Sequence, residues 1–438
     1  MFFVRCVHLT ASHEPVWNSD RLKDVLRLDG APMPDVSTHD CSLAPLNEDL
    51  LSSRQKRLRE VMRRRGIPAV LTADPINIIY GCGARNMTIF GMMGPSRFLL
   101  LFADGPSILF EFAGSEHLAN ALATVDEVRP APGITANSGP DFRVAVHAFA
   151  ADIAAECRRQ WGHRLGNDAA LAVERVDFLL TDALRSEGIT ILDATEVFLD
   201  ARRIKQPQEI EVMRQAVRRV EHAVECVEQA LKAGTTEVEV WATFHQDLIA
   251  RGGEYVSTRL LQSGQNTFPY FKEAGERIIY DGDLLCIDTD AIGYGGYAVD
   301  LSRTFLCGSQ APTPPQRLLY SRAYEQLQHN AALLMPGRSF EEFARQAWEV
   351  PAEHRPFGYY CLLHGLGLCG EHPYVPLYSQ GQPYPMHGQF EPGMVVCIES
   401  YIGDAAAAQG VKLEDQFLIT AEGVERLTRY PFDKRFLP

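Results

Sequence analysis

The sequence predicts a mixed α/β protein with two domains, and three observations predict this fold class. The chain has 438 residues, which is more than a single domain usually contains. Residues 46–204 alternate helix-like and strand-like segments, joined by turns that contain Gly and Pro. After residue 205, a long amphipathic helix is followed by apolar strands that end in acidic residues. We expect domains at 46–204 and 205–438, preceded by an irregular N-terminal arm at 1–45.

The predicted first domain begins with a charged helix in RQKRLREVMRRRG, residues 54–66. Strands are expected at AVLTA (69–73), RFLLLF (97–102) and SILFEF (107–112), because these short apolar runs are bounded by turn residues. No group of residues in this part forms a recognisable catalytic or metal-binding pattern. We therefore expect the chemistry to reside in the second domain.

The second domain begins with a helix from Gln208, in which apolar residues recur at three-to-four spacing, and Gly234 lies just beyond its end. Thr236 and Glu239 form a capping box that starts another helix. Strands are expected at 283–290 and 298–307, on either side of the Gly-rich turn GYGGY. Helices at 315–334 and 339–349 follow, and the last strands are MVVCIES and KLEDQFLIT.

Composition limits the possible functions. The formal net charge is -14 and no run of Lys or Arg occurs, which argues against a nucleic-acid or anionic-membrane surface. The 10 cysteines are scattered without a CxxC pair, a pattern typical of reduced thiols in a cytoplasmic protein. No segment has the length of a transmembrane helix, and the first residues lack a signal-peptide core. We therefore expect a cytoplasmic enzyme that acts on a small molecule.

Five residues of the second domain carry side chains that bind divalent cations, and they lie beside apolar strands. Asp288 ends LLCI and Glu399 ends VVCI, whereas Glu414 lies within the alternating strand VKLEDQFLI. Asp300 follows the Gly-rich turn, and His364 follows CLL and opens an HGLG turn. A charged side chain is rarely buried unless it is paired or bound to a metal. Each residue alone fits an ion pair or a strand-end cap, but together they predict a two-metal site.

The order of these motifs resembles the pita-bread metalloenzyme superfamily, which includes methionine aminopeptidases, prolidases and creatinases. The resemblance covers residues of about 205–430 and rests on an Asp strand, a second Asp, HGxG, a GMVxxxE strand and a KLED strand. It implies a pita-bread C-terminal domain after a smaller creatinase-type α/β domain. It also implies that the metal ligands are Asp288, Asp300, His364, Glu399 and Glu414.

Three departures from the peptidase pattern argue against peptide hydrolysis. The chain reads IDTD where the superfamily usually has Asp-x-Gly, so Asp290 adds a carboxylate. Residues i and i+2 of a strand share a face, so we expect Asp290 to point at the same metals, and a role in the following turn is the alternative. No His follows SGQN, although the peptidases place a catalytic His after SGxN for proton transfer. Glu371 and His372 also occur in the reverse of the peptidase order.

A closer resemblance is to the DddP-type dimethylsulfoniopropionate lyases, which are carbon-sulfur lyases with the same fold. It rests on DPINIIY near Asp74, the IDTD strand, and the strings YYCLLHGLGLCGEHP, EPGMVVCIE and KLEDQFLIT followed by LTRYPFD. It runs through both predicted domains and implies a homodimer. It also implies two divalent metal ions of the iron type, and manganese, cobalt and zinc suit the same ligands. The implied ligands are Asp288, Asp290, Asp300, His364, Glu399 and Glu414.

The resemblance implies a β-elimination that converts dimethylsulfoniopropionate to dimethyl sulfide and acrylate. Tyr270 and Tyr359 match aromatic residues at the lyase site, and their ring faces suit a sulfonium cation. The resemblance implies that Tyr270 binds the substrate and that Tyr359 acts in catalysis, although both residues also fit an ordinary core. The lyases carry an Asp, assigned as the base, six residues after the ligand His, where this chain has Gly370. Either another group serves as the base or the substrate is different. The candidate bases are Glu371, His372 and Asp290.

Two other functions stay open. A C-N hydrolase of the Xaa-Pro dipeptidase or creatinase type would need the histidine that is missing after SGQN. A non-catalytic pita-bread binding protein would have lost its metal ligands, whereas this chain keeps them. The sequence therefore favours a metal-dependent lyase and does not decide between dimethylsulfoniopropionate and a related β-substituted carboxylate.

Overall fold

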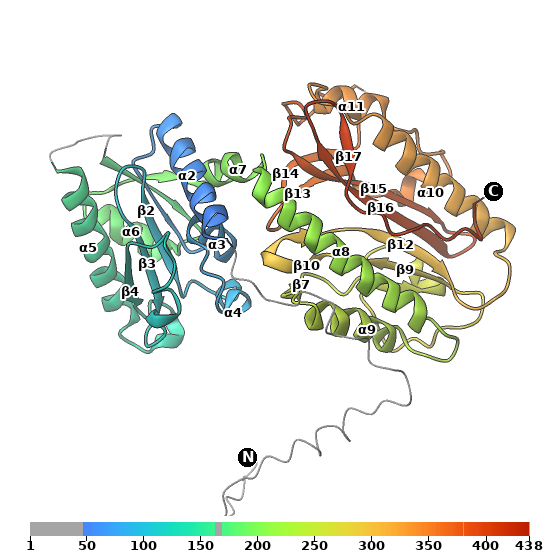
Figure 1. Ribbon diagram of the computed structural model, residues 1–438, viewed down its shortest axis with the longest axis horizontal. Helices are drawn as coiled ribbons and strands as arrows, with labels where there is room; N and C mark the ends of the chain where they lie inside the picture. The colour runs from blue at the N-terminus through green and yellow to red at the C-terminus, as the bar shows by residue number, and fades with distance from the viewer. Residues whose placement is uncertain (1–46, 163–168, 380, 438) are drawn as a thin grey trace, which may run out of the picture. The chain divides into compact units, whose positions relative to one another are not determined.

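The computed structural model describes residues 47–162, 169–379 and 381–437 (Figure 1). The predicted N-terminal arm, Cys6 and Cys41 lie outside the described residues. The eight described cysteines are free, as the sequence predicts. No helix in the described ranges is both long and apolar enough to cross a bilayer.

Six strands form the first sheet, in the order β4-β3-β2-β1-β5-β6. They are β1 (Ala69–Thr72), β2 (Phe98–Phe102), β3 (Ser107–Phe112), β4 (Glu127–Ala131), β5 (Ala170–Glu174) and β6 (Thr190–Asp193). Successive residues of β1 and β2 face opposite sides of the sheet. One side packs against α5 (Phe142–Trp161) and α6 (Phe178–Ser186), and the other against α2 (Glu48–Arg64) and α3 (Pro75–Cys82). The strands and the first helix predicted for this part are confirmed.

Four residues join this part to the rest of the chain. Helix α7 (Thr195–Arg202) ends just before them, and α8 (Pro207–Ala230) begins just after. Pro207 occupies the first turn of α8, where its missing N–H costs nothing, and Gln206 and Glu209 form a capping box there. The long helix is therefore confirmed with Pro207 inside it, and the domain boundary at 204/205 stays a prediction.

The larger sheet has eight strands. Seven follow the order β14-β13-β15-β16-β12-β9-β8, and β17 pairs with β16. The strands are β8 (Leu261–Ser263), β9 (Leu284–Asp288), β12 (Ser302–Leu306), β13 (Cys361–Leu366), β14 (Gly370–Pro376), β15 (Val395–Asp404), β16 (Gln409–Ile419) and β17 (Val424–Arg426). A small sheet in the order β11-β10-β7 is made by β7 (Tyr255–Val256), β10 (Ala291–Ile292) and β11 (Ala298–Val299). The single strand predicted at 298–307 is therefore two strands, because the chain leaves β11 before it enters β12.

Helices cover both faces of the large sheet (Figure 1). Helix α8 and α9 (Glu237–Ala250) share one core with β8 and β9, and α10 (Pro314–Ala332) and α11 (Phe340–Gln346) share another with β13 and β15. The capping box at Thr236 is confirmed. Helix α11 ends at Gln346, before the predicted Glu349. The chain leaves the helix there, because the backbone N–H of Trp348 donates to Asn330 Oδ1 and the Trp348 side chain packs on the core shared by α10 and α11.

Arg54 of α2 is buried against Tyr297 and against Glu209 of α8. Its guanidinium donates to the Tyr297 hydroxyl and lies 4.8 Å from the ring centroid. Its Nε is 3.6 Å from Glu209 Oε1, which also accepts a hydrogen bond of 2.7 Å from Tyr297. Arg54 is 0 % exposed and Glu209 is 2 % exposed, so water screens neither charge. This triad links α2 to the first turn of α8.

We predict that Arg54→Met lowers the free energy of unfolding by about 3–5 kcal/mol, because it leaves the buried Glu209 carboxylate without its cation. Urea denaturation measures the loss. Lys56→Met, an exposed change on the same helix, is the control and stays within about 0.5 kcal/mol of the wild type. The double variant Arg54→Met/Glu209→Gln recovers part of the loss. Equal losses for the single and double variants would contradict this account of the triad.

Candidate metal centre

Neighbouring strands of the large sheet bring three predicted ligands together. β12 lies between β9 and β16, and Ser302 of β12 pairs with Asp288 on one side and with Glu414 on the other. Glu399 of β15 pairs with Glu414. Directly opposed residues of antiparallel strands have Cβ atoms about 4.5–5.5 Å apart. Strand register therefore places two carboxylates on either side of Ser302 and a third beside Glu414.

His364 joins this group from β13, where it lies within the strand and not in the turn that HGLG predicted. Its Nδ1 donates to the Gly365 carbonyl at 3.2 Å, which directs Nε2 toward the acids. Nε2 lies 3.1 Å from Glu399 Oε1, 3.6 Å from Glu414 Oε1 and 3.7 Å from Asp300 Oδ2. Burial lowers the pKa of His364, but the neighbouring carboxylates of Glu399 and Glu414 outweigh it and raise the pKa well above its ordinary value. The carboxylates therefore favour a cation at Nε2, either a proton or a metal ion.

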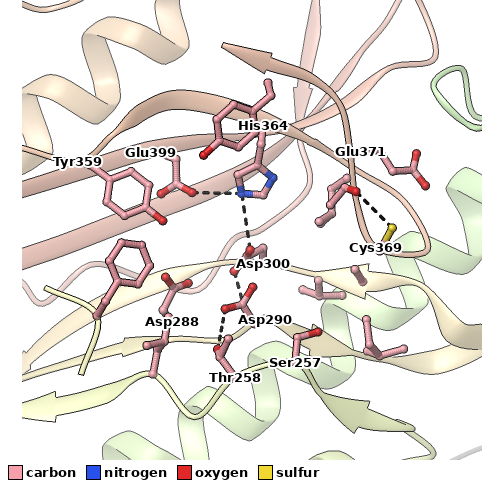
Figure 2. Close-up of a pocket in the computed structure, with 18 of the residues that line it drawn as sticks. Ser257, Thr258, Asp288, Asp290, Asp300, Tyr359, His364, Cys369, Glu371 and Glu399 are labelled. Carbon is pink, nitrogen blue, oxygen red and sulfur yellow. Dashed lines mark hydrogen bonds and ion pairs between the residues drawn. The ribbon is translucent and has the colours of Figure 1, made fainter. Parts of the chain in front are cut away.

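Asp290 does not lie on a strand, so the argument that placed it on the face of Asp288 is wrong. β9 ends at Asp288, and Asp290 adopts a left-handed backbone with φ 36° before β10 begins. The Asp290 carboxylate nevertheless lines the same cavity as Asp288, and Thr258 Oγ1 donates to its Oδ2 at 2.6 Å (Figure 2). Burial, followed by the charge of Asp288, raises the pKa of Asp290 to about 6. A turn, not strand alternation, brings Asp290 beside the predicted ligands.

Sequence reasoning missed Lys412, whose ammonium lies among the acids and is 0 % exposed. Nζ donates to Glu399 Oε2 at 2.6 Å, to Glu414 Oε2 at 2.8 Å and to Ser302 Oγ at 2.7 Å. Asp288 Oδ2 is 3.4 Å away. Lys412 precedes Glu414 by two residues on β16, so strand alternation was a signal that could have found it.

One ammonium does not compensate all of these acids. Burial, followed by the charge of Glu414, raises the pKa of Asp300 well above its ordinary value. The same two causes raise the pKa of Glu399. Burial acts in the same direction on Glu414, but Lys412 and His364 outweigh it and lower the Glu414 pKa. The site therefore favours additional positive charge.

The donor atoms fit divalent cations. Oε1 of Glu414 is buried and has no hydrogen-bond partner within the described part of the chain. Two groups of possible ligand atoms meet at Glu414, each within 4.8 Å of one another: Asp288, Asp300 and Glu414, and His364, Cys397 and Glu414. Carboxylate oxygen and imidazole nitrogen suit iron, manganese, cobalt and zinc. Two divalent ions and the buried lysine ammonium would together balance the charge of the five neighbouring carboxylates.

A cavity of about 490 Å³ opens over these residues. Figure 2 shows Tyr359 on one side of the acids and Cys369 and Glu371 on the other. Among the described residues that line the cavity, His364 is the only histidine. The predicted ligands in the lining are Asp288, Asp290, Asp300, His364 and Glu399.

Tyr270, predicted to bind the substrate, and Tyr359, predicted to act in catalysis, both lie at this site. Tyr270 donates its hydroxyl hydrogen to Asp288 Oδ2, and its ring centroid is 5.7 Å from that of Tyr359. Lys412 Nζ lies 5.0 Å from the Tyr359 centroid. Burial, followed by the charge of Glu399, raises the pKa of Tyr359 well above its ordinary value. Its hydroxyl therefore remains protonated at neutral pH and can donate a hydrogen bond but cannot act as a base.

Glu371 lines the cavity, but its carboxylate is held by two cations. Arg202 Nε donates to Oε1 at 2.9 Å, and Lys205 Nζ donates to Oε2 at 2.7 Å. Burial raises the pKa of Glu371, but Lys205 and Arg202 outweigh it and lower the pKa below its ordinary value. A carboxylate held in this way is a weak base, which argues against the predicted catalytic role. Its partners are distant in sequence, so no local pattern revealed them.

His372 and Gly370 also bear on the missing base. His372 is not part of the cavity lining, and its ring packs edge-on against Phe340 with centroids 5.6 Å apart. This position argues against the predicted catalytic role of His372. Gly370 does line the cavity, and a Cβ built there would meet nothing within 4 Å. The position can therefore accept a side chain without a clash.

Comparison with known proteins places this chain in a family. Residues 211–421 match the model of metallopeptidase family M24. The chain is 36% identical to the dimethylsulfoniopropionate lyase DddP of Roseovarius nubinhibens over 87% of this chain and 86% of that protein, and 33% identical to the DddP of Roseobacter denitrificans over the same shares. The prolidase from Pyrococcus horikoshii matches with a TM-score of 0.69 at 23% identity, over 87% of this chain and 99% of that one. This structural match confirms the predicted pita-bread fold.

We predict that Lys412→Met destabilises the metal-free protein more than the metal-loaded protein. Without metal, the variant leaves several buried carboxylates with no cation, a loss of about 3–5 kcal/mol. Melting temperatures with EDTA and with saturating Mn²⁺ measure the difference, and the metal-induced rise is larger in the variant than in the wild type. Lys412→Arg keeps the charge and serves as the control. Equal losses with and without metal would show that Lys412 does not share charge compensation with the metal ions.

We predict that Glu371→Gln lowers the free energy of unfolding by about 3–5 kcal/mol near pH 7, because it leaves Arg202 and Lys205 unpaired. The folded-state pKa of Glu371 lies below its unfolded value. Its contribution is therefore present above the ordinary carboxyl pKa of about 4.3 and is lost as the pH falls through the folded-state pKa. Urea titrations at several pH values measure the gap to the wild type, which narrows in acid. Glu276→Gln, at an exposed site, is the control, and a gap that widens in acid would contradict the prediction.

Proposed function

Because the chain belongs to the DddP family of dimethylsulfoniopropionate lyases, within metallopeptidase family M24, we propose that it is a metal-dependent carbon-sulfur lyase. Its substrate is dimethylsulfoniopropionate or a closely related β-substituted carboxylate. The cavity carries the proposal: its described lining includes five of the six predicted ligands and a lyase-type tyrosine, and it holds no histidine besides His364. A hydrolase of this fold would need a second histidine for proton transfer. We further propose that the enzyme is a cytoplasmic homodimer.

Five residues would hold two metal ions, which we propose to be iron: Asp288, Asp300, His364, Glu399 and Glu414. Bound divalent ions would accept the substrate carboxylate and offset the charge that develops when the neighbouring carbon loses its proton. Lys412 orients two of the ligands. Its ammonium donates hydrogen bonds to Oε2 of both Glu399 and Glu414. Oε1 of each carboxylate therefore faces the imidazole of His364.

We assign proton abstraction to Asp290. Of the three candidate bases, it is the one whose carboxylate lines the cavity without being paired to cations, since Thr258 is its side-chain partner. The proton leaves the carbon next to the substrate carboxylate, and the released electron pair forms the new double bond. The carbon-sulfur bond breaks, and dimethyl sulfide departs with its electron pair. The ring faces of Tyr270 and Tyr359 would attract the sulfonium before that step.

We predict that the purified, iron-loaded protein releases dimethyl sulfide from dimethylsulfoniopropionate, measured in the headspace by gas chromatography. Asp290→Asn lowers the rate by about 10²–10⁴-fold, as expected for the loss of a general base. The metal content of this variant, measured by mass spectrometry, stays at the wild-type level if Asp290 is the base. Gly370→Asp restores part of the activity in the Asp290→Asn background, because a side chain at residue 370 enters the cavity freely.

Two outcomes would revise these assignments. A loss of metal together with activity in Asp290→Asn would make Asp290 a metal ligand, as the sequence predicted. If the wild type releases no dimethyl sulfide but the Gly370→Asp variant does, the scaffold is that of a lyase whose own substrate is a different molecule. Xaa-Pro dipeptides and creatine, tested beside the sulfonium, separate hydrolysis from elimination, and turnover of either one in place of the sulfonium would overturn the proposal.

A further inference from the structure

Five aromatic rings in continuous contact lead away from the acids, and we call them the aromatic strip: Tyr270, Phe271, Tyr359, Tyr360 and Tyr374. The centroids are 5.7 Å apart for Tyr270 and Tyr359, 4.6 Å for Tyr359 and Tyr360, and 5.8 Å for Tyr360 and Tyr374. Phe271 stacks on Tyr359 at 5.5 Å. The strip begins where the Tyr270 hydroxyl meets Asp288, and every ring except Tyr270 lines the cavity.

The outer part of the strip is open to a ligand. Phe271 is 50 % exposed, Tyr360 53 % and Tyr374 41 %, although large aromatic side chains are usually buried. Lys412 approaches the inner rings, at 5.0 Å from Tyr359 and 5.7 Å from Tyr270. Among the described residues, no cationic side chain lies over the three outer rings. Their faces are therefore free to attract a cation from solution.

The space around the strip exceeds the needs of a small sulfonium. The cavity of about 490 Å³ lies within the range of about 300–1,000 Å³ that holds drug-sized ligands. Gly370 contributes to this space, because it lines the cavity on the same strand as Tyr374 and leaves the position of a side chain empty. Dimethylsulfoniopropionate is a short zwitterion and would fill only the part near the acids.

We propose that the outer strip, formed by Phe271, Tyr360 and Tyr374, is a subsite for the cationic end of a substrate whose onium group carries substituents larger than methyl. The substrate class is a 3-onio carboxylate, with the carboxylate at the metal centre and an apolar or aromatic substituent of the onium along the strip. This proposal rests on the proposed lyase function for the position of the carboxylate. The ring faces attract the cationic end while the metal centre holds the carboxylate end.

Binding of non-reactive probes to the metal-loaded protein tests the subsite without turnover. Isothermal titration calorimetry compares tetramethylammonium with benzyltrimethylammonium, which have the same charge and differ in one substituent. The wild type binds the benzyl compound more tightly. Tyr374→Leu and Tyr360→Leu each raise the Kd of benzyltrimethylammonium by between about twofold and about thirtyfold, which is the range expected for the loss of one cation–π contact. Tyr374→Phe retains wild-type affinity, and Tyr280→Leu, an exposed tyrosine outside the cavity, is the matched control.

Turnover supplies an independent readout. The ratio of kcat/KM for 3-(benzylmethylsulfonio)propionate to that for dimethylsulfoniopropionate exceeds one in the wild type and falls in Tyr374→Leu, mainly through KM. Equal affinities of the wild type for the two probes would overturn the subsite. So would a change in oligomeric state in the leucine variants with unchanged probe binding, because the strip would then be a contact between copies. Selective probe binding without turnover of either sulfonium would instead overturn the lyase function and leave the subsite in place.

Discussion

Mutual repulsion among buried carboxylates is the constraint on which this structure depends. Two like charges about 4 Å apart repel by about 4 kcal/mol at an effective dielectric constant of about 20. Asp288, Asp300, Glu399 and Glu414 are all at most 5 % exposed. Three of them surround a single ammonium, and Asp300 lies beside Asp288 and Glu414. Flexible loops would move apart under this force. These acids instead lie on or directly beside paired strands. The backbone hydrogen bonds and apolar cores of the strands keep the acids close together against their mutual repulsion.

The part of the chain before the metal-binding strands helps to shape the cavity. Arg202, at the end of α7, donates to Glu371, to the Cys369 sulfur at 2.8 Å and to Asn77 of α3 at 2.7 Å. Glu371 Oε1 in turn accepts from the backbone N–H of Leu368, in the turn between β13 and β14. The turn that follows His364 is therefore fixed by residues far away in the sequence. The six-stranded part contributes to the cavity wall through this network and is more than a separate scaffold.

Local patterns predicted most of the elements and the acids that the structure brings together. Acids at the ends of apolar runs identified Asp288 and Glu399 correctly as members of one site, because a buried charge needs a partner wherever it occurs. Errors arose where the chain leaves regular structure. Asp290 sits in a left-handed turn, and no periodic rule anticipates that conformation. The surroundings of Glu371 depend on cations about 170 residues away, which only the tertiary fold brings near.

The pairing of Ser302 with both Asp288 and Glu414 has a consequence for how the protein matures. If the pairing of β12 slipped by one residue, every side chain on it would turn to the opposite face of the sheet. Asp288 and Glu414, on its two neighbouring strands, would then no longer both pair with Ser302. Such a chain would still bury many apolar residues, yet it could not assemble the donor atoms. A divalent cation bound to these acids would therefore stabilise the correctly registered sheet and not the slipped one.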